Sequence, residues 1–272
     1  MDQETLERFL SDLPMGWVKY LETVGSTNNF ASRWVKEGAL DFSLVIANEQ
    51  TAGKGRLGRK WVTLPDSALA FSLILKNPFP EQSVPNAFIP RITGLGALAV
   101  CTAIQKDYQL PVNIKWSNDL LIDGHKIGGI LAEARWRGDE LTAIILGIGI
   151  NITSDSIPQG YSLNYPAGAL EQYTGCSVDR LQLLVSVLRE INHWRALLQE
   201  NVFIDAWERN LAYKNEWVGV FQGNGHNDVP IYEGRILGLN PDGALRLGLW
   251  DGKEKSVYAG DIRIRPVDML LK

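Results

Sequence analysis

Cysteine and histidine are scarce in this sequence, whose 272 residues include two cysteines and three histidines. Cys101 and Cys176 are too few for a disulfide framework, and they lack the spacing of metal ligands. We therefore expect two free thiols in a reducing compartment and no metal site built by the protein itself.

Long hydrophobic runs and a strong net charge are also missing. No segment approaches the ~18 uninterrupted apolar residues that span a membrane, and the charged N-terminus MDQETLERFL lacks the apolar segment of a signal peptide. The formal net charge of −4 creates no field that attracts nucleic acid or an anionic membrane. Because 45% of the residues are hydrophobic, the chain can bury a core, and we expect a cytoplasmic globular protein with no membrane partner.

Hydrophobic periodicity predicts an α+β fold up to about residue 214. The expected strands cover residues 17–24, 43–49 and 68–75, and the expected helices cover residues 27–36, 90–106, 178–200 and 203–212. Residues 112–150 have the pattern of an antiparallel meander, with turns at Asp123-Gly124 and Gly138-Asp139. The sequence therefore predicts a largely antiparallel sheet with helices packed on it.

The character of the chain changes after residue 214. Short strand-like segments (WVGVF, IYEGRILGLN, ALRLGLW, KSVYAG and IRIRPV) alternate with Gly, Asn, Pro and Asp turns. This pattern is typical of a small β-barrel. We expect two domains, at residues 1–214 and 215–272.

One basic, glycine-rich segment stands out against the acidic net charge. In QTAGKGRLGRKW, residues 50–61, three glycines alternate with four cationic side chains. Backbone amides in such a loop form anion-binding nests, and arginine adds a planar fork for phosphate or carboxylate. The spacing matches neither the Walker loop nor the dinucleotide fingerprint, and a mobile surface loop is the alternative.

Two strands carry further polar groups. In VNIKW, alternation places Ile114 and Lys115 on opposite faces of a strand. The charged lysine therefore either binds a ligand or reaches water from an edge strand. Alternation in LGIGIN places Gly147, Gly149 and Asn151 on one face, where bare backbone accepts either a flat ligand or a crossing helix. Lysine and arginine beside such a space favour the activation of a carboxylate by a nucleoside triphosphate.

Four ordered motifs carry a resemblance to a known family. GSTNN (25–29), QTAGKGRLGRKW (50–61), KWSNDLLIDGHKIGGILAE (115–133) and GIGIN (147–151) resemble the motif set of biotin protein ligases. The C-terminal YEGRILGLNPDGALRLGL resembles the small terminal barrel of that family. The likeness extends over about residues 20–267. It implies a mixed, largely antiparallel sheet related to class II synthetases, followed by a β-barrel.

The resemblance also implies a reaction. Family members convert biotin and MgATP to biotinyl-5′-AMP and then transfer biotin to a lysine of a biotin carboxyl carrier protein. Because the first motif begins at Gly25, too few residues precede it for a winged helix-turn-helix domain. We therefore expect the monofunctional type, without DNA binding.

Site residues follow from the same motifs. The family pattern gives Lys115 and Arg56 catalytic roles. The positions that the resemblance assigns to biotin are Ser26, Thr27, Asn28, Gln50, Gly53, Lys54, Arg56, Lys115, Gly128 and Gly147. Those that it assigns to the nucleotide are Arg56, Arg59, Trp61, Asn113, Asn118, Asp119 and Asn151. From the residues alone, Ser26 and Thr27 would be a helix cap and Gln50 a strand end.

Two positions depart from the family pattern. Lys54 stands where arginine is usual and loses the bidentate fork, and Ser117 stands where proline is usual. A lipoate or octanoate ligase and a non-catalytic biotin sensor are the alternative functions, and nucleic-acid binding by the terminal barrel is a weaker one. Family dimers often form by pairing sheet edges, and LTAIILGIGIN is either the candidate strand for such a homodimer or, through its apolar face, part of the core.

Overall fold

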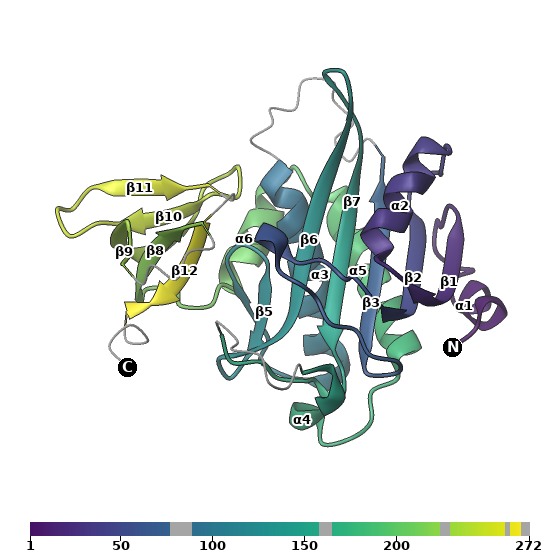
Figure 1. Ribbon diagram of the computed structural model, residues 1–272. Coiled ribbons are helices and arrows are strands. Elements are labelled where there is room, and N and C mark those ends of the chain that lie inside the picture. Colours follow the sequence, from purple (N-terminus) through teal and green to yellow (C-terminus); the bar gives the residue numbers. More distant parts are fainter. Residues whose placement is uncertain (77–88, 158–164, 224–228, 259–261, 268–272) are drawn as a thin grey trace.

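The computed structural model describes residues 1–76, 89–157, 165–223, 229–258 and 262–267. Its larger part is a seven-stranded sheet in the order β1-β2-β3-β7-β6-β5-β4 (Figure 1). The strands are β1 (Val18–Val24), β2 (Ser43–Gln50), β3 (Ala68–Leu75), β4 (Asn113–Lys115), β5 (Asp119–Ile122), β6 (His125–Arg137) and β7 (Glu140–Asn151). Only the β1–β2 pair is parallel, so the predicted mixed, largely antiparallel sheet is confirmed.

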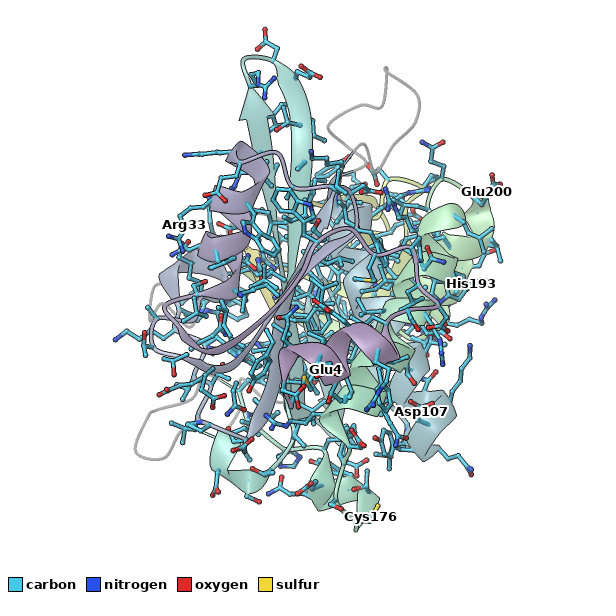
Figure 2. The ribbon with its side chains drawn as sticks, turned by 90° about the vertical axis from the view of Figure 1, so that its right-hand side faces the viewer. Glu4, Arg33, Asp107, Cys176, His193 and Glu200 are labelled. Carbon is cyan, nitrogen blue, oxygen red and sulfur yellow. The ribbon has the colours of Figure 1, made fainter. Side chains whose placement is uncertain are left out.

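Helices cover both faces of this sheet. One face carries α2 (Thr27–Lys36), and the opposite face carries α3 (Ile89–Tyr108) and α5 (Arg180–Ala196), as the side view in Figure 2 shows. Alternation along β7 divides the core between them, because Leu146, Ile148 and Ile150 pack on the α3 side while Ala143 and Ile145 pack under α2.

The predicted helices are confirmed, with ends that differ by a few residues. α5 begins at Arg180, where the Asp179 carboxylate accepts backbone N–H bonds from Leu181 and Gln182 at 2.8 and 3.1 Å. α6 spans Asn201–Arg209. The short helices α1 (Gln3–Phe9) and α4 (Glu171–Thr174) were not expected from the sequence. No helix in the described ranges is both long and apolar enough to cross a membrane.

The C-terminal strands form a second, antiparallel sheet in the order β11-β10-β9-β8-β12. They are β8 (Trp217–Gln222), β9 (Tyr232–Leu239), β10 (Leu245–Gly248), β11 (Glu254–Val257) and β12 (Ile262–Pro266). This confirms the predicted strands. Within the residues that the structure describes, no pairing joins β11 to β12, so closure into a barrel and the boundary at residue 214 stay predictions.

Specific contacts fasten the second sheet to the first. The buried guanidinium of Arg91 on α3 donates to the carbonyls of Leu198 and Pro241. The indole of Trp116, next to Lys115, donates to the carbonyl of Gly243 at 3.0 Å. The second sheet is therefore tied directly to the strand that carries Lys115.

β7 is not the free strand that a sheet-edge dimer requires. Residues Ile144–Ile150 pair with β3 on one side and with β6 on the other. This part of LTAIILGIGIN cannot serve as a dimer edge, because its backbone groups are already used within the sheet, and a homodimer stays a prediction.

Two glycines of α3 allow a test of the core. A Cβ at Gly94 would overlap the indole of Trp207, whereas one at Gly96 would meet methyl groups of Ile130 and Leu146 at 3.0 Å. Both alanine variants gain about the same helix propensity. Because a rigid ring adjusts less than methyl groups, we expect Gly94→Ala to be less stable than Gly96→Ala by about 1–3 kcal/mol. Equal urea unfolding midpoints would contradict this packing.

Candidate functional site

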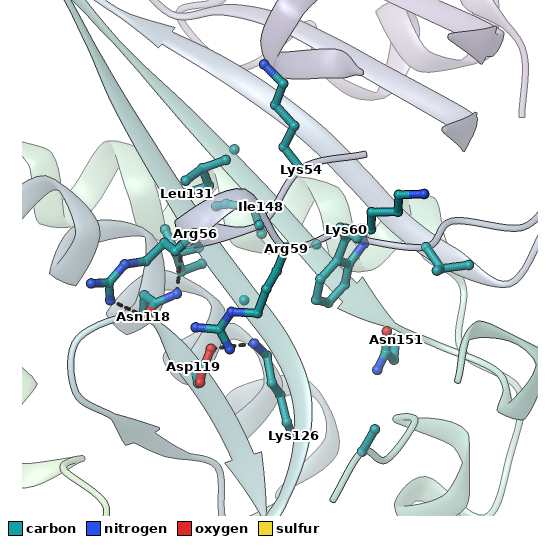
Figure 3. Close-up of a pocket in the computed structure, with 18 of the residues that line it drawn as sticks. Lys54, Arg56, Arg59, Lys60, Asn118, Asp119, Lys126, Leu131, Ile148 and Asn151 are labelled. Carbon is teal, nitrogen blue, oxygen red and sulfur yellow. Dashed lines mark hydrogen bonds and ion pairs between the residues drawn. The ribbon is translucent and has the colours of Figure 1, made fainter. Parts of the chain in front are cut away.

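A cavity of about 470 Å³ opens on the sheet face that carries α2, beside the N-terminal end of that helix. Its lining includes residues of the β2–β3 loop and of β5, β6 and β7 (Figure 3). Residues of β12, in the second sheet, complete it. Eight lining residues are cationic: Lys54, Arg56, Arg59, Lys60, Lys115, Lys126, Arg263 and Arg265. Among the described lining residues, Asp119 is the one carboxylate. In a protein of net charge −4, this concentration of positive charge makes the cavity a candidate anion site.

The floor of the cavity is the glycine strip predicted from LGIGIN. Ala143 and Ile145 of β7 pack against α2. Because side chains alternate along a strand, Gly147 and Gly149 lie on the same face of β7, farther along the chain. A Cβ at Gly147 would collide with the amide of Asn28, and one at Gly149 would collide with the indole of Trp61. The strip is therefore covered by two side chains, Asn28 from the first turn of α2 and Trp61 from the β2–β3 loop.

A buried polar network forms one end of the cavity. The Gln50 amide oxygen accepts bonds from the backbone N–H and the hydroxyl of Thr27, at 2.8 and 3.1 Å. The Asn28 amide donates to Glu133 at 2.8 Å, and its oxygen lies 2.6 Å from the hydroxyl of Ser72. Because each group is held by its neighbours, this end presents fixed donors and acceptors to a ligand.

The glycine-rich segment folds back on itself as a hairpin. The backbone N–H of Trp61 donates to Gly53 at 2.9 Å, and that of Gly55 donates to Arg59 at 2.7 Å. The guanidinium of Arg56 reaches across the cavity to Ser117 and Asn118, at 2.9 and 2.7 Å (Figure 3). The hairpin thus covers the cavity and brings its arginines to the β4–β5 turn.

The other end of the cavity holds a coupled set of charges. The Asp119 carboxylate lies 2.5 Å from the Lys126 ammonium and 3.6 Å from that of Lys115. Burial would raise the pKa of Asp119, but the charges of Lys126 and Lys115 outweigh it and lower the pKa to about 2. Burial lowers the pKa of Lys115 to about 8, with Asp119 opposing and Lys126 adding to the shift.

Most of the predicted site residues lie together in this cavity. Those that line it are Ser26, Thr27, Asn28, Gln50, Lys54, Arg56, Arg59, Trp61, Lys115, Asn118, Asp119, Gly147 and Asn151. Asn151 also donates to the carbonyl of Gly168 at 3.0 Å.

The two positions that departed from the family pattern have polar partners. Lys54 donates to Asn29 at 2.6 Å, and Ser117 accepts a hydrogen bond from Arg56.

Three predicted residues lie outside the lining. Gly53 faces the backbone of Trp61, where a Cβ would collide with the carbonyl oxygen. Gly128 faces Leu120 inside the sheet, and its neighbour Gly129 lines the cavity instead. The side chain of Asn113 is exposed, with its amide 3.3 Å from the Pro111 carbonyl. These positions shape the hairpin and the strands rather than contact the cavity directly.

Several lining residues were not predicted. Lys126 lies in the KIGGIL motif, and a lysine at the start of a strand gave no signal of its own. Tyr165, Arg263 and Arg265 come from segments far along the chain, and only the tertiary fold brings them to the cavity. No pattern in the sequence connects them to Lys115.

The packing of Trp61 on the glycine strip gives a test. In Gly149→Ala the new methyl group would displace the indole, at a cost on the order of 1 kcal/mol, and release the hairpin. We expect trypsin to cleave after Arg56 and Arg59 roughly fivefold faster than in the wild type. Gly55→Ala, whose added Cβ would meet nothing closer than 3.5 Å, is the matched control. Equal cleavage rates in the two variants would refute the packing argument.

The comparisons with known proteins agree with this geometry. Residues 20–151 match the family model of the biotin/lipoate A/B protein ligases. The bifunctional ligase/repressor BirA of Bacillus spizizenii is 31% identical over 251 residues, which cover 90% of this chain and 73% of that protein. The biotin–[acetyl-CoA-carboxylase] ligase of Paracoccus denitrificans is 29% identical over 236 residues, 84% of this chain and 92% of that protein.

A solved structure shows the same fold. The biotin protein ligase of Aquifex aeolicus, in complex with biotin and ATP, superposes with a TM-score of 0.75 at 27% identity. The likeness covers 92% of this chain and 99% of the Aquifex chain. The sequence identity to BirA over most of both chains, together with this fold, shows that the chain belongs to the biotin protein ligase family and is a ligase.

Proposed function

We propose that this protein activates biotin with MgATP to biotinyl-5′-AMP and transfers the biotinyl group to a lysine of a biotin carboxyl carrier protein. The observation that carries the proposal is the polarity of the cavity, which joins a neutral hydrogen-bonding end to a strongly cationic end. Biotin has a ureido ring at one end and a carboxylate at the other. The Aquifex relative, which was solved with biotin and ATP, supports the same assignment.

The neutral end suits the ureido ring. That ring carries two N–H donors and a carbonyl acceptor, and Thr27, Asn28 and Gln50 present hydroxyl and amide groups in the cavity. The apolar dithiolane of lipoate or the alkyl chain of octanoate could form no hydrogen bonds with these groups, whereas the ureido ring of biotin could. We therefore favour biotin over the acids of the related ligases.

The cationic end suits adenylation. A carboxylate oxygen of biotin attacks the α-phosphorus of ATP, the bond to the bridging oxygen breaks, and pyrophosphate leaves. Both reactants are anions, so Lys115 and Arg56 lower the barrier by neutralising charge that builds up in the transition state. The hairpin over the cavity excludes water, which protects the mixed anhydride until transfer.

Magnesium enters as part of the substrate. In the described ranges, no three His, Cys, Asp or Glu side chains are grouped closely enough to hold a metal ion. Mg²⁺ is commonly held by substrate phosphates with one or two carboxylates, so we expect it to arrive bound to ATP. Asp119, the carboxylate of the cavity, is the residue that would face the ion.

Transfer requires a neutral amine on the carrier. The amine nitrogen attacks the acyl carbon of the anhydride, AMP leaves with the bonding electrons, and the nitrogen gives up a proton. Asp119, with a pKa of about 2, is a weak base, whereas Lys115, with a pKa of about 8, exchanges protons readily near neutral pH. We therefore assign the proton acceptor to the neutral form of Lys115.

The first test compares acids in the exchange of labelled pyrophosphate into ATP. We expect exchange with biotin and at least about tenfold less with lipoate or octanoate, because those acids cannot form the hydrogen bonds that the polar end of the pocket offers to a ureido ring. Exchange that depends on the fatty acids instead would assign the protein to lipoate chemistry. Biotin binding without any exchange would indicate a sensor.

The second test removes the lysine ammonium. Lys115→Ala is expected to bind biotin normally but to lose about a hundredfold in exchange rate, which is the scale of lost electrostatic stabilisation. Asn113→Ala is the control on the same strand, because its side chain is exposed and lies outside the cavity lining. A Lys115→Ala rate close to that of the wild type would remove this residue from the mechanism.

A further inference from the structure

The aromatic ring of Tyr165 lies against the proposed catalytic lysine. The Lys115 ammonium nitrogen is 4.1 Å from the ring centroid, well within the distance of a cation–π contact. Both residues line the cavity, although fifty positions separate them in the chain. Neither the glycine-loop motif nor the KWSND motif includes this tyrosine.

The segment after Tyr165 is fastened to the sheet. The backbone N–H of Lys126 donates to Pro166 at 2.7 Å, and that of Gly168 donates back to Lys126 at 2.9 Å. The Asn151 amide adds a bond to Gly168 at 3.0 Å. Strands β6 and β7 therefore set the position of this segment, and with it the ring, relative to Lys115.

The carboxylate of Asp119 does not fully offset the cost of burying the Lys115 ammonium. Asp119 is the acidic partner of Lys115, but its carboxylate is closer to Lys126, at 2.5 Å against 3.6 Å. Burial of the Lys115 ammonium disfavours its charged form. The negative face of an aromatic ring stabilises a desolvated cation more strongly than an exposed one, so the ring compensates for part of this burial.

The hydroxyl of Tyr165 does not explain the contact. It is buried, and it has no hydrogen-bond partner within the described residues. Burial, followed by the negative charges of Asp119 and Glu216, raises the pKa of this tyrosine to about 12, so it stays neutral at working pH. The ring face is therefore the part of Tyr165 that acts on Lys115.

We propose that Tyr165 is a positioning residue whose ring seats the Lys115 ammonium in the cavity and favours its charged form. The proposal rests on the proposed function, in which charged Lys115 assists adenylation. It predicts that phenylalanine replaces Tyr165 without loss and that an aliphatic side chain does not.

The first experiment measures Lys115 without any substrate. Lysines are ¹³C-methylated, the Lys115 resonance is assigned by its loss in Lys115→Arg, and its pKa is followed by NMR titration. We expect the pKa in Tyr165→Leu to fall by about half a unit or more, because the charged form loses its π contact. The pKa in Tyr165→Phe is expected to match the wild type. The charged groups that also act on Lys115, and stay constant across these variants, are Asp119, Lys126, Arg59 and Arg265.

The second experiment measures biotin-dependent pyrophosphate exchange. Tyr165→Leu should lose roughly tenfold in kcat with an unchanged KM for biotin, and Tyr165→Phe should stay within about twofold of the wild type. Because charged Lys115 is the active form, the alkaline fall of kcat/KM for ATP should occur at lower pH in Tyr165→Leu. A merely structural residue would change stability without this pH shift.

The outcomes separate the two proposals. An unchanged Lys115 pKa in Tyr165→Leu, or an equal change in Tyr165→Phe, overturns the role of the ring. Absence of exchange in the wild type contradicts the proposed function, while the titration still decides the ring contact. If thermal unfolding shows that Tyr165→Leu does not fold, Tyr165→Met fills similar space without a π face and takes its place.

Discussion

Gly147 and Gly149 leave the backbone of β7 bare on the sheet face that α2 covers, and both walls of the cavity rest against that backbone. Asn28 from α2 occupies the space above Gly147, and Trp61 from the basic hairpin occupies the space above Gly149. One methyl group at either position would push away the side chain that forms a wall. The cavity, the hairpin above it and the polar network at its end therefore all depend on two missing side chains.

A second constraint is electrostatic. Asp119 is the one carboxylate of the described lining, and its neighbours Lys115 and Lys126 share it. The shared carboxylate offsets the repulsion between the two ammonium groups and helps to hold both of them in position. In the proposed function, the phosphates of ATP would meet cations that are already in place, so little reorganisation would remain for the reaction itself.

The second sheet belongs to this arrangement as well. Arg263 and Arg265 of β12 reach the cavity lining, while Trp116 and Arg91 bond to the turn that precedes β10. A strand from the C-terminal part of the chain thus helps to enclose a site that is built on the first sheet.

The amino-acid sequence by itself determined the period-2 and period-3.6 elements, the bare strip of β7 and the anion-binding character of the hairpin. These depend on neighbouring residues, whose spacing decides which side chains share a face. Family motifs added Thr27, Asn28 and Gln50, which look locally like a helix cap and a strand end. Only the tertiary structure decided that β7 is interior, that Asn113 and Gly128 lie outside the cavity, and that Tyr165 lies under Lys115. Those facts depend on strand order and on contacts between distant segments, for which local periodicity carries no information.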